Sequence, residues 1–164
     1  MEQAKIPRYP RMPVTIMMEQ RGQKWQVIGI LPRTGAASGE SGRHLVRDDG
    51  ETRIYQWLGL ELPLMPDGCD DYWYNLTSEQ PRLYVICQPD AQGGPVPLRV
   101  TADQDDAVAA EEHEEWFFQA AMPVPIVLWI KDYVAAHYRP GPRKGKIKGK
   151  GGDKYRNPFD ARKP

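Results

Sequence analysis

Proline and glycine divide this chain into short segments. The sequence contains 16 prolines and 15 glycines among 164 residues. Proline cannot donate a hydrogen bond inside a helix or a central strand, and glycine marks turns, so this density argues against a bundle of long helices. It favours short strands joined by tight turns. A chain of this length is expected to form one domain with a substantial buried core.

Six segments before Ala102 carry patterns that are typical of strands. Residues 13–31 predict a hairpin, and residues 53–64 predict a third strand in which Gly59 indicates a bulge or a bend. Residues 71–76, 82–88 and 96–101 predict the remaining three strands. Because Pro97 has no N–H to donate, the last of them is expected at a sheet edge. Residues 33–50 are rich in Gly, Ser, Arg and Asp, and predict an exposed, mobile loop or a weak extra strand.

The pattern changes after Thr101. Residues 101–115 combine seven acids with alanines and predict a short helix. Trp116-Phe117-Phe118 is too apolar to stay exposed, so the segment to Met122 should lie against the sheet, with residues 113–122 either helical or extended. Pro123 and Pro125 fit the first turn of a helix that runs to His137. We therefore predict an α+β domain over residues 11–138. It consists of a curved antiparallel sheet of about six strands, a meander or half-barrel, packed by one or two C-terminal helices; residues 1–10 are expected to be flexible.

Charge is divided between two parts of the chain. Residues 139–164 contain ten Lys and Arg against two acids, a net charge of +8. Subtracting these from the totals of 22 each leaves 12 basic and 20 acidic residues in 1–138, a net charge of −8. Such asymmetry is typical of a partner-binding tail. We expect a disordered basic tail that aids solubility, binds nucleic acid, docks on an acidic protein or folds back on the body. Its candidate contacts are Arg143, Lys144, Lys146, Lys148 and Lys150.

Composition also bears on the compartment. Cys69 and Cys87 are too few for a disulfide framework or a cysteine-based zinc site. The N-terminal residues form no apolar signal segment, and no run approaches the ~18 apolar residues of a membrane span. We expect a soluble protein of the reducing cytoplasm that does not associate with membranes.

Motifs for catalysis and cofactor binding do not emerge from the sequence. The Gly- and Lys-rich residues 145–152 lack the spacing of a phosphate loop and the hydroxyl residue that follows its lysine. His113 lies among four glutamates, which indicates a solvated acidic face more than a zinc site. Cys87 alternates with apolar residues as a core thiol does, and the acids beside Cys69 disfavour its thiolate. We therefore expect no enzyme, no metal and no cofactor.

The stretch from Tyr72 to Pro81 is the most distinctive part of the sequence. Three consecutive aromatic residues precede Thr77 and Ser78, whose hydroxyls can bond nearby backbone and define a tight connection. The alternative is an interaction surface made by Trp73, Tyr74, Glu79 and Gln80. A further alternative is an aromatic pocket for a small ligand, lined by Tyr55, Trp57, Tyr72 and Tyr74.

The box Asn75-Leu76-Thr77-Ser78-Glu79-Gln80-Pro81 resembles one found in an uncharacterised bacterial family of short soluble proteins, a domain of unknown function. The resemblance extends to the early Val-Thr-Ile-Met-Met-Glu-Gln-Arg stretch, the strand at Trp25, the Met-Pro-Val-Pro helix start and the Ala-His-Tyr-Arg-Pro end, over roughly residues 12–142. Genes of that family tend to accompany those of molybdenum-dependent formate dehydrogenase and its maturation factors. No catalytic residues are established for it, so none can be assigned to positions of this chain.

The resemblance implies a non-enzymatic accessory protein that assists the biogenesis or assembly of formate dehydrogenase. Its expected partner is a subunit of that enzyme or a maturation factor. Two alternatives remain open. The tail can make the protein a nucleic-acid binder, or an aromatic pocket can make it a small ligand binder or enzyme.

Overall fold

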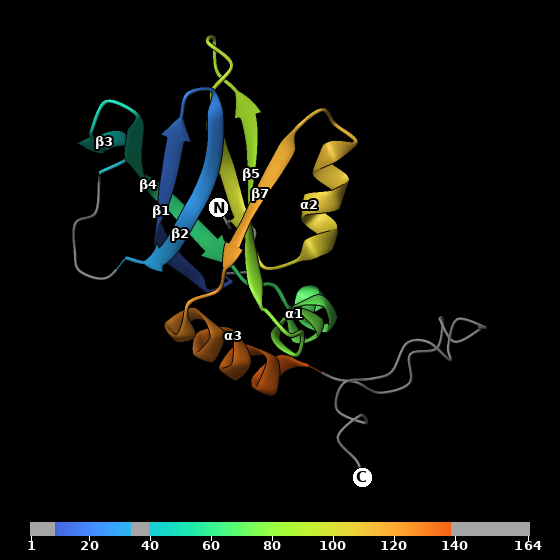
Figure 1. Ribbon diagram of the computed structural model, residues 1–164. Coiled ribbons are helices and arrows are strands. Elements are labelled where there is room, and N and C mark those ends of the chain that lie inside the picture. Colours follow the sequence, from blue (N-terminus) through green and yellow to red (C-terminus); the bar gives the residue numbers. More distant parts are fainter. Residues whose placement is uncertain (1–8, 34–39, 139–164) are drawn as a thin grey trace, which may run out of the picture.

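The structure, a computed structural model, describes residues 9–33 and 40–138, which form two antiparallel sheets flanked by helices (Figure 1). The first part of the chain contributes β1 (Arg11–Arg21), β2 (Lys24–Pro32), β3 (Gly42–Asp48), β4 (Thr52–Pro63), the 3-10 turn η1 (Pro66–Gly68) and α1 (Cys69–Leu76). The second part contributes β5 (Arg82–Pro89), β6 (Pro95–Thr101), α2 (Gln104–Glu111), β7 (Trp116–Ala121) and α3 (Val124–His137).

The first sheet has four strands in the order β2-β1-β4-β3. The predicted hairpin is confirmed, since β1 and β2 pair antiparallel. The predicted bulge at Gly59 is also confirmed. Val14 pairs with Leu60 and Ile16 with Trp57, so β4 holds one extra residue there, and Gly59 has a φ of 101°. For residues 33–50 the sequence predicts either an exposed loop or a weak extra strand. Their second half forms a strand, β3, whose residues are almost all exposed.

The second sheet has three strands in the order β6-β5-β7. The prediction that the strand containing Pro97 lies at an edge is confirmed. Residues 116–121 form β7, which pairs with β5. Most of residues 113–122 is therefore extended and not helical. The side chains of β5 alternate, so that Leu83, Val85 and Cys87 face the main core, while Tyr84 and Ile86 lie on the opposite face of the sheet and are also buried.

The prediction of one sheet with about six strands is wrong. The strands divide into two sheets because the chain leaves β4 through η1 and α1 before it re-enters at β5, and in the described part of the chain no ladder joins the two halves. Strands β4 and β6 lie next to each other, as do β2 and β7, and the core fills the space between the sheets. The fold is α+β, as predicted.

The predicted strand at residues 71–76 is also wrong, because this segment belongs to α1. Three adjacent aromatic residues hide the helical spacing of the apolar residues in this segment. Cys69, Tyr72 and Leu76, three and four residues apart, face the core, as on one side of a helix. Asp70 and Asp71 in the first turn suit the positive end of the helix dipole.

Helices close the core and cover one sheet. Pro123 and Pro125 lie at the start of helix α3, as predicted. The helix buries Ile126, Ile130, Tyr133 and Val134 against the core. Each fully buried side chain of this size contributes about 2 kcal/mol relative to exposure. Helix α1 packs beside α3, while α2, within the predicted residues 101–115, packs against the second sheet (Figure 1). Within the described residues, no helix is long and apolar enough to cross a membrane.

Candidate functional site

The connection between α1 and β5 is held by the side chain of Asn75. Its amide nitrogen donates to the carbonyl oxygens of Arg82 at 2.8 Å and Ala102 at 2.9 Å, and its amide oxygen accepts from the Arg82 N–H at 2.9 Å. One side chain therefore ties the end of α1 to the start of β5 and to the residue after β6. The hydroxyls of Thr77 and Ser78 donate to carbonyls of the last turn of α1. The predicted hydrogen bonds of Thr77 and Ser78 to nearby backbone are present, but they lie at the end of a helix and not in a turn between two strands.

Beside this connection lies a cavity of about 730 Å³, which we call the α1–α2 cleft. Its walls come from α1, the α1–β5 connection, β5, α2 and β7. The lining residues are Asp71, Tyr74, Asn75, Ser78, Glu79, Gln80, Arg82, Tyr84, Gln104, Asp105, Phe117 and Gln119.

Arg82 provides the positive charge of the cleft lining. Its guanidinium donates to the amide oxygens of Gln80 and Gln119, both at 3.0 Å. Both partners are neutral amides, and together they fix the position of the guanidinium from two sides. Nearby, the rings of Tyr84 and Phe117 meet edge to face, with centroids 5.7 Å apart.

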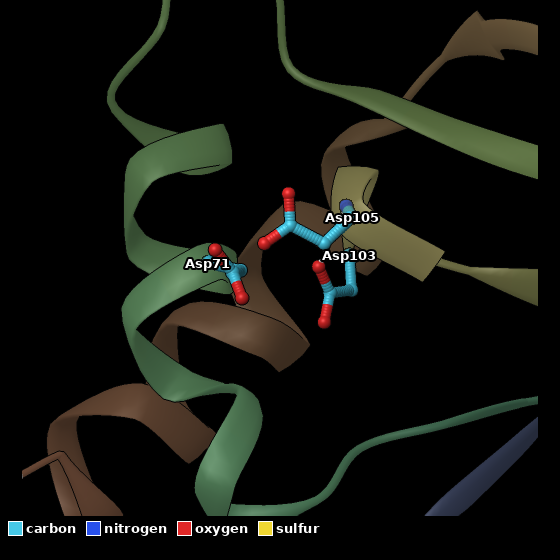
Figure 2. Close-up of side chains that lie close together, drawn as sticks. All are labelled: Asp71, Asp103 and Asp105. Atoms are coloured by element: carbon cyan, nitrogen blue, oxygen red, sulfur yellow. Dashed lines mark hydrogen bonds between the residues drawn. The ribbon is translucent and has the colours of Figure 1, made fainter. Parts of the chain in front are cut away.

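Three carboxylates gather where α1 approaches the start of α2. Asp71, Asp103 and Asp105 have carboxylate oxygens within 4.8 Å of one another, and their side chains occupy the space between the two helices (Figure 2). Burial, together with the negative charges of Asp103 and Asp105, raises the pKa of Asp71 to about 7. Burial also raises the pKa of Asp103, although its bond to the backbone N–H of Asp105 opposes this. Asp103 is the N-cap of α2, which explains why an acid is held there.

The acidic group has two chemical capacities. Oxygen ligands of this kind suit hard cations such as Mg²⁺ and Ca²⁺, so these are the described residues that could hold a metal. A carboxyl whose pKa is close to 7 can also exchange protons at neutral pH. The sequence does not reveal this group, because residues 71–76 carry the pattern of a strand and Asp71 is among them. The only available signal was the run of acids at the start of α2, where Asp103 could be identified as a cap.

The four predicted interaction residues do not all lie on one surface. Tyr74, Glu79 and Gln80 line the cleft together, and Tyr74 is 62% exposed. Trp73 instead packs against the core. The predicted tail contacts at residues 143–150 lie outside the described residues.

The four aromatic residues of the predicted pocket occupy different places. Tyr74 lines the α1–α2 cleft, whereas Tyr72 is buried and its hydroxyl accepts from the Met65 N–H at 3.0 Å. Tyr55 lines another cavity, of about 570 Å³, where it stacks on Trp25. Trp57 packs against the core.

Both thiols lie in surroundings that suppress reactivity. Burial raises the pKa of Cys87 to about 12. Burial and the charges of Asp70 and Asp67 raise the pKa of Cys69 to about 11. The thiolate is the reactive form, so neither residue is prepared for nucleophilic chemistry.

Comparison with known proteins identifies a family. No curated protein and no solved structure matches the chain. Residues 13–148 match the family described as "Protein of unknown function (DUF3305)", a range that includes the described strands except the first two residues of β1, the described α-helices and every residue lining the cleft. The chain therefore belongs to the DUF3305 family.

Proposed function

We propose that the protein is a non-enzymatic accessory protein that binds another protein through the α1–α2 cleft. The observation that carries this proposal is the position of Tyr74. Its side chain is 62% exposed at the cleft, on a helix whose end is anchored by the three hydrogen bonds of Asn75. A large aromatic side chain held on a rigid frame loses little entropy on binding, and such residues often dominate interface energies.

Glu79, Gln80 and Arg82 add specificity to this anchor. Their charged and amide groups border the same cleft, and Gln80 and Arg82 hold each other in place by a hydrogen bond of 3.0 Å. An aromatic anchor surrounded by oriented polar groups is the arrangement found at the centre of many protein interfaces.

The partner that we propose is a subunit of molybdenum-dependent formate dehydrogenase or one of its maturation factors. Support for this choice comes from the resemblance described above, in which genes of the family accompany those of the enzyme. The cleft is an argument for a protein partner of some kind. The association of the genes is the argument for choosing formate dehydrogenase or a maturation factor as that partner.

Affinity capture from the native host, grown under conditions that induce formate dehydrogenase, tests the proposal. Tagged wild-type protein should recover a subunit or a maturation factor, and a deletion strain should lose formate dehydrogenase activity. Tyr74→Ala should weaken binding to the captured protein by at least about 10-fold, as expected for an aromatic anchor. Leu45→Ala is the matched control, because Leu45 is 53% exposed on β3 and does not line the cleft. Failure to recover any such protein, together with normal activity in the deletion strain, would refute the proposal.

A small ligand is the second candidate occupant, favoured by the volume of the cleft. About 730 Å³ lies within the range of roughly 300–1,000 Å³ that is usual for ligand sites. A thermal-shift screen of soluble metabolites checks this alternative. A compound that stabilises the wild type, and does so less in Tyr74→Ala than in Leu45→Ala, would support it; no stabilising compound would count against it.

A further inference from the structure

The α1–α2 cleft carries an excess of negative charge. Among the described residues, Asp71, Glu79 and Asp105 line it against one guanidinium, that of Arg82, and Asp103 adds a carboxylate within 4.8 Å of Asp71 and Asp105. The pKa of Asp71 is raised to about 7 by burial and by its neighbouring carboxylates, as expected where negative charge is concentrated. The cleft therefore favours a cationic occupant.

A cationic segment is present in the same chain. Residues 139–150, which we call the basic segment, contain six Lys and Arg and no acid. Lysines occupy every second position from Lys144 to Lys150. An extended chain would place these four side chains on one side, about 7 Å apart. Their aliphatic stems could pack on Tyr74 and Tyr84 while the ammonium groups meet carboxylates.

The place where the described chain ends brings this segment within reach. Tyr138 follows directly after α3, and α3 packs on α1 through Tyr133 and Tyr72, whose ring centroids are 6.5 Å apart. Asp71, which lines the cleft, is adjacent to Tyr72 in the sequence. Helix α1 therefore has α3 on one side and the cleft on another. The six residues from Tyr138 to Lys144 can span up to roughly 20 Å. An eight-residue helix such as α1 is only about 12 Å long.

We propose that the basic segment occupies the α1–α2 cleft of its own chain, with lysine ammonium groups beside Asp71, Glu79 and Asp105, and that a protein partner must displace it. The displacement rests on the function proposed above, whereas the docking does not. A short tether gives an effective concentration on the order of 1 mM. An intrinsic dissociation constant of about 0.1 mM would then keep the cleft roughly 90% occupied.

Zero-length cross-linking of the full-length protein tests the contact directly. A carbodiimide joins a carboxylate to a lysine only where the two meet. The expected products link residues 144–150 to Asp71, Glu79 or Asp105, and their yield falls as salt rises because the contact is electrostatic. In a mixture of ¹⁵N-labelled and unlabelled protein, each product should contain one isotope. Mixed-isotope products would show that a second copy supplies the segment and would overturn the proposal.

A matched pair of variants measures occupancy by proteolysis, without cross-linking. The double change Glu79→Gln and Asp105→Asn removes two charges from the cleft, and Glu111→Gln with Glu112→Gln removes two from the other end of α2. Trypsin cuts after lysines of the basic segment only when they are free. Cleavage should be about 3- to 10-fold faster in the cleft variant than in the wild type, with the control variant unchanged.

Equal cleavage rates in the wild type and both variants would overturn the inference, as would cross-links that join the basic segment to Glu111 and Glu112 as often as to the cleft. Neither experiment contains a partner protein. Failure of docking is thereby distinguished from failure of the proposed function, which affinity capture tests separately.

Discussion

Replacement of Asn75 by alanine should destabilise the protein strongly, because this one side chain holds the start of the α1–β5 connection. The side chain makes three hydrogen bonds, of 2.8, 2.9 and 2.9 Å, to the backbone of Arg82 and Ala102. These bonds join α1 to the paired strands β5 and β6, because Arg82 begins β5 and Ala102 follows β6. The Asn75→Ala substitution leaves one backbone N–H and two carbonyls without this partner.

The expected loss is about 3 kcal/mol in the free energy of unfolding, at about 1 kcal/mol for each bond. Asn75 is partly buried, so water can replace some of the lost partners and keep the loss near this value. For a domain of this size, that loss corresponds to a fall of about 10 °C in Tm. Asn75→Asp keeps the shape and one acceptor but turns a carboxylate toward two carbonyl oxygens. It should therefore destabilise at pH 7 at least as much as alanine does.

Urea denaturation followed by tryptophan fluorescence and far-UV circular dichroism measures the effect. Ser78→Ala is the control, because it removes a single exposed hydrogen bond to the Asn75 carbonyl in the same connection. It should cost less than about 1 kcal/mol. If Asn75→Ala lies within about 0.5 kcal/mol of the wild type, a range typical of surface substitutions, the side chain does not hold the connection.

The remaining predictions concern protonation, backbone conformation and thiol reactivity. The folded pKa of Asp71, about 7, lies above its ordinary value of 3.8. The stability that this carboxyl contributes is therefore fully present below about pH 4 and lost as the pH rises toward 7. At high salt, which weakens the contact of the basic segment with Asp71, wild-type Tm should fall from pH 5 to pH 8, and Asp71→Asn should melt higher than the wild type at pH 8; a lower Tm would contradict the assignment. Gly59→Ala should cost about 2–3 kcal/mol in urea denaturation, since φ is 101° and a Cβ would lie 2.7 Å from that of Ser41; a loss below about 0.5 kcal/mol would show that the bulge relaxes freely. At pH 8, Cys69 and Cys87 should react with a disulfide reagent roughly a hundredfold more slowly than in the unfolded chain, and comparable rates would refute their inertness.

Local patterns predicted much of the fold. The hairpin of β1 and β2, the bulge at Gly59 and the edge position of the strand containing Pro97 all follow from the conformational preferences of one or two residues and their neighbours. Helix α3 follows from two prolines at its start and an apolar period of 3.6 residues. The error at α1 has the same origin, because three adjacent aromatic residues satisfy the strand and the helix period equally well.

The sequence alone determined the short elements, the α+β class, the partition of charge and the candidate residues Tyr74, Glu79 and Gln80. Only the tertiary structure decided that the strands form two sheets and that Asp71 meets Asp103 and Asp105, more than thirty residues away. It also turned Tyr74 toward the cleft and its neighbour Trp73 toward the core. The physical reason is the sequence separation of the interactions involved. Propensity and periodicity report interactions within a few residues, whereas the cleft is produced by helices packing on a sheet, and that packing depends on the whole core.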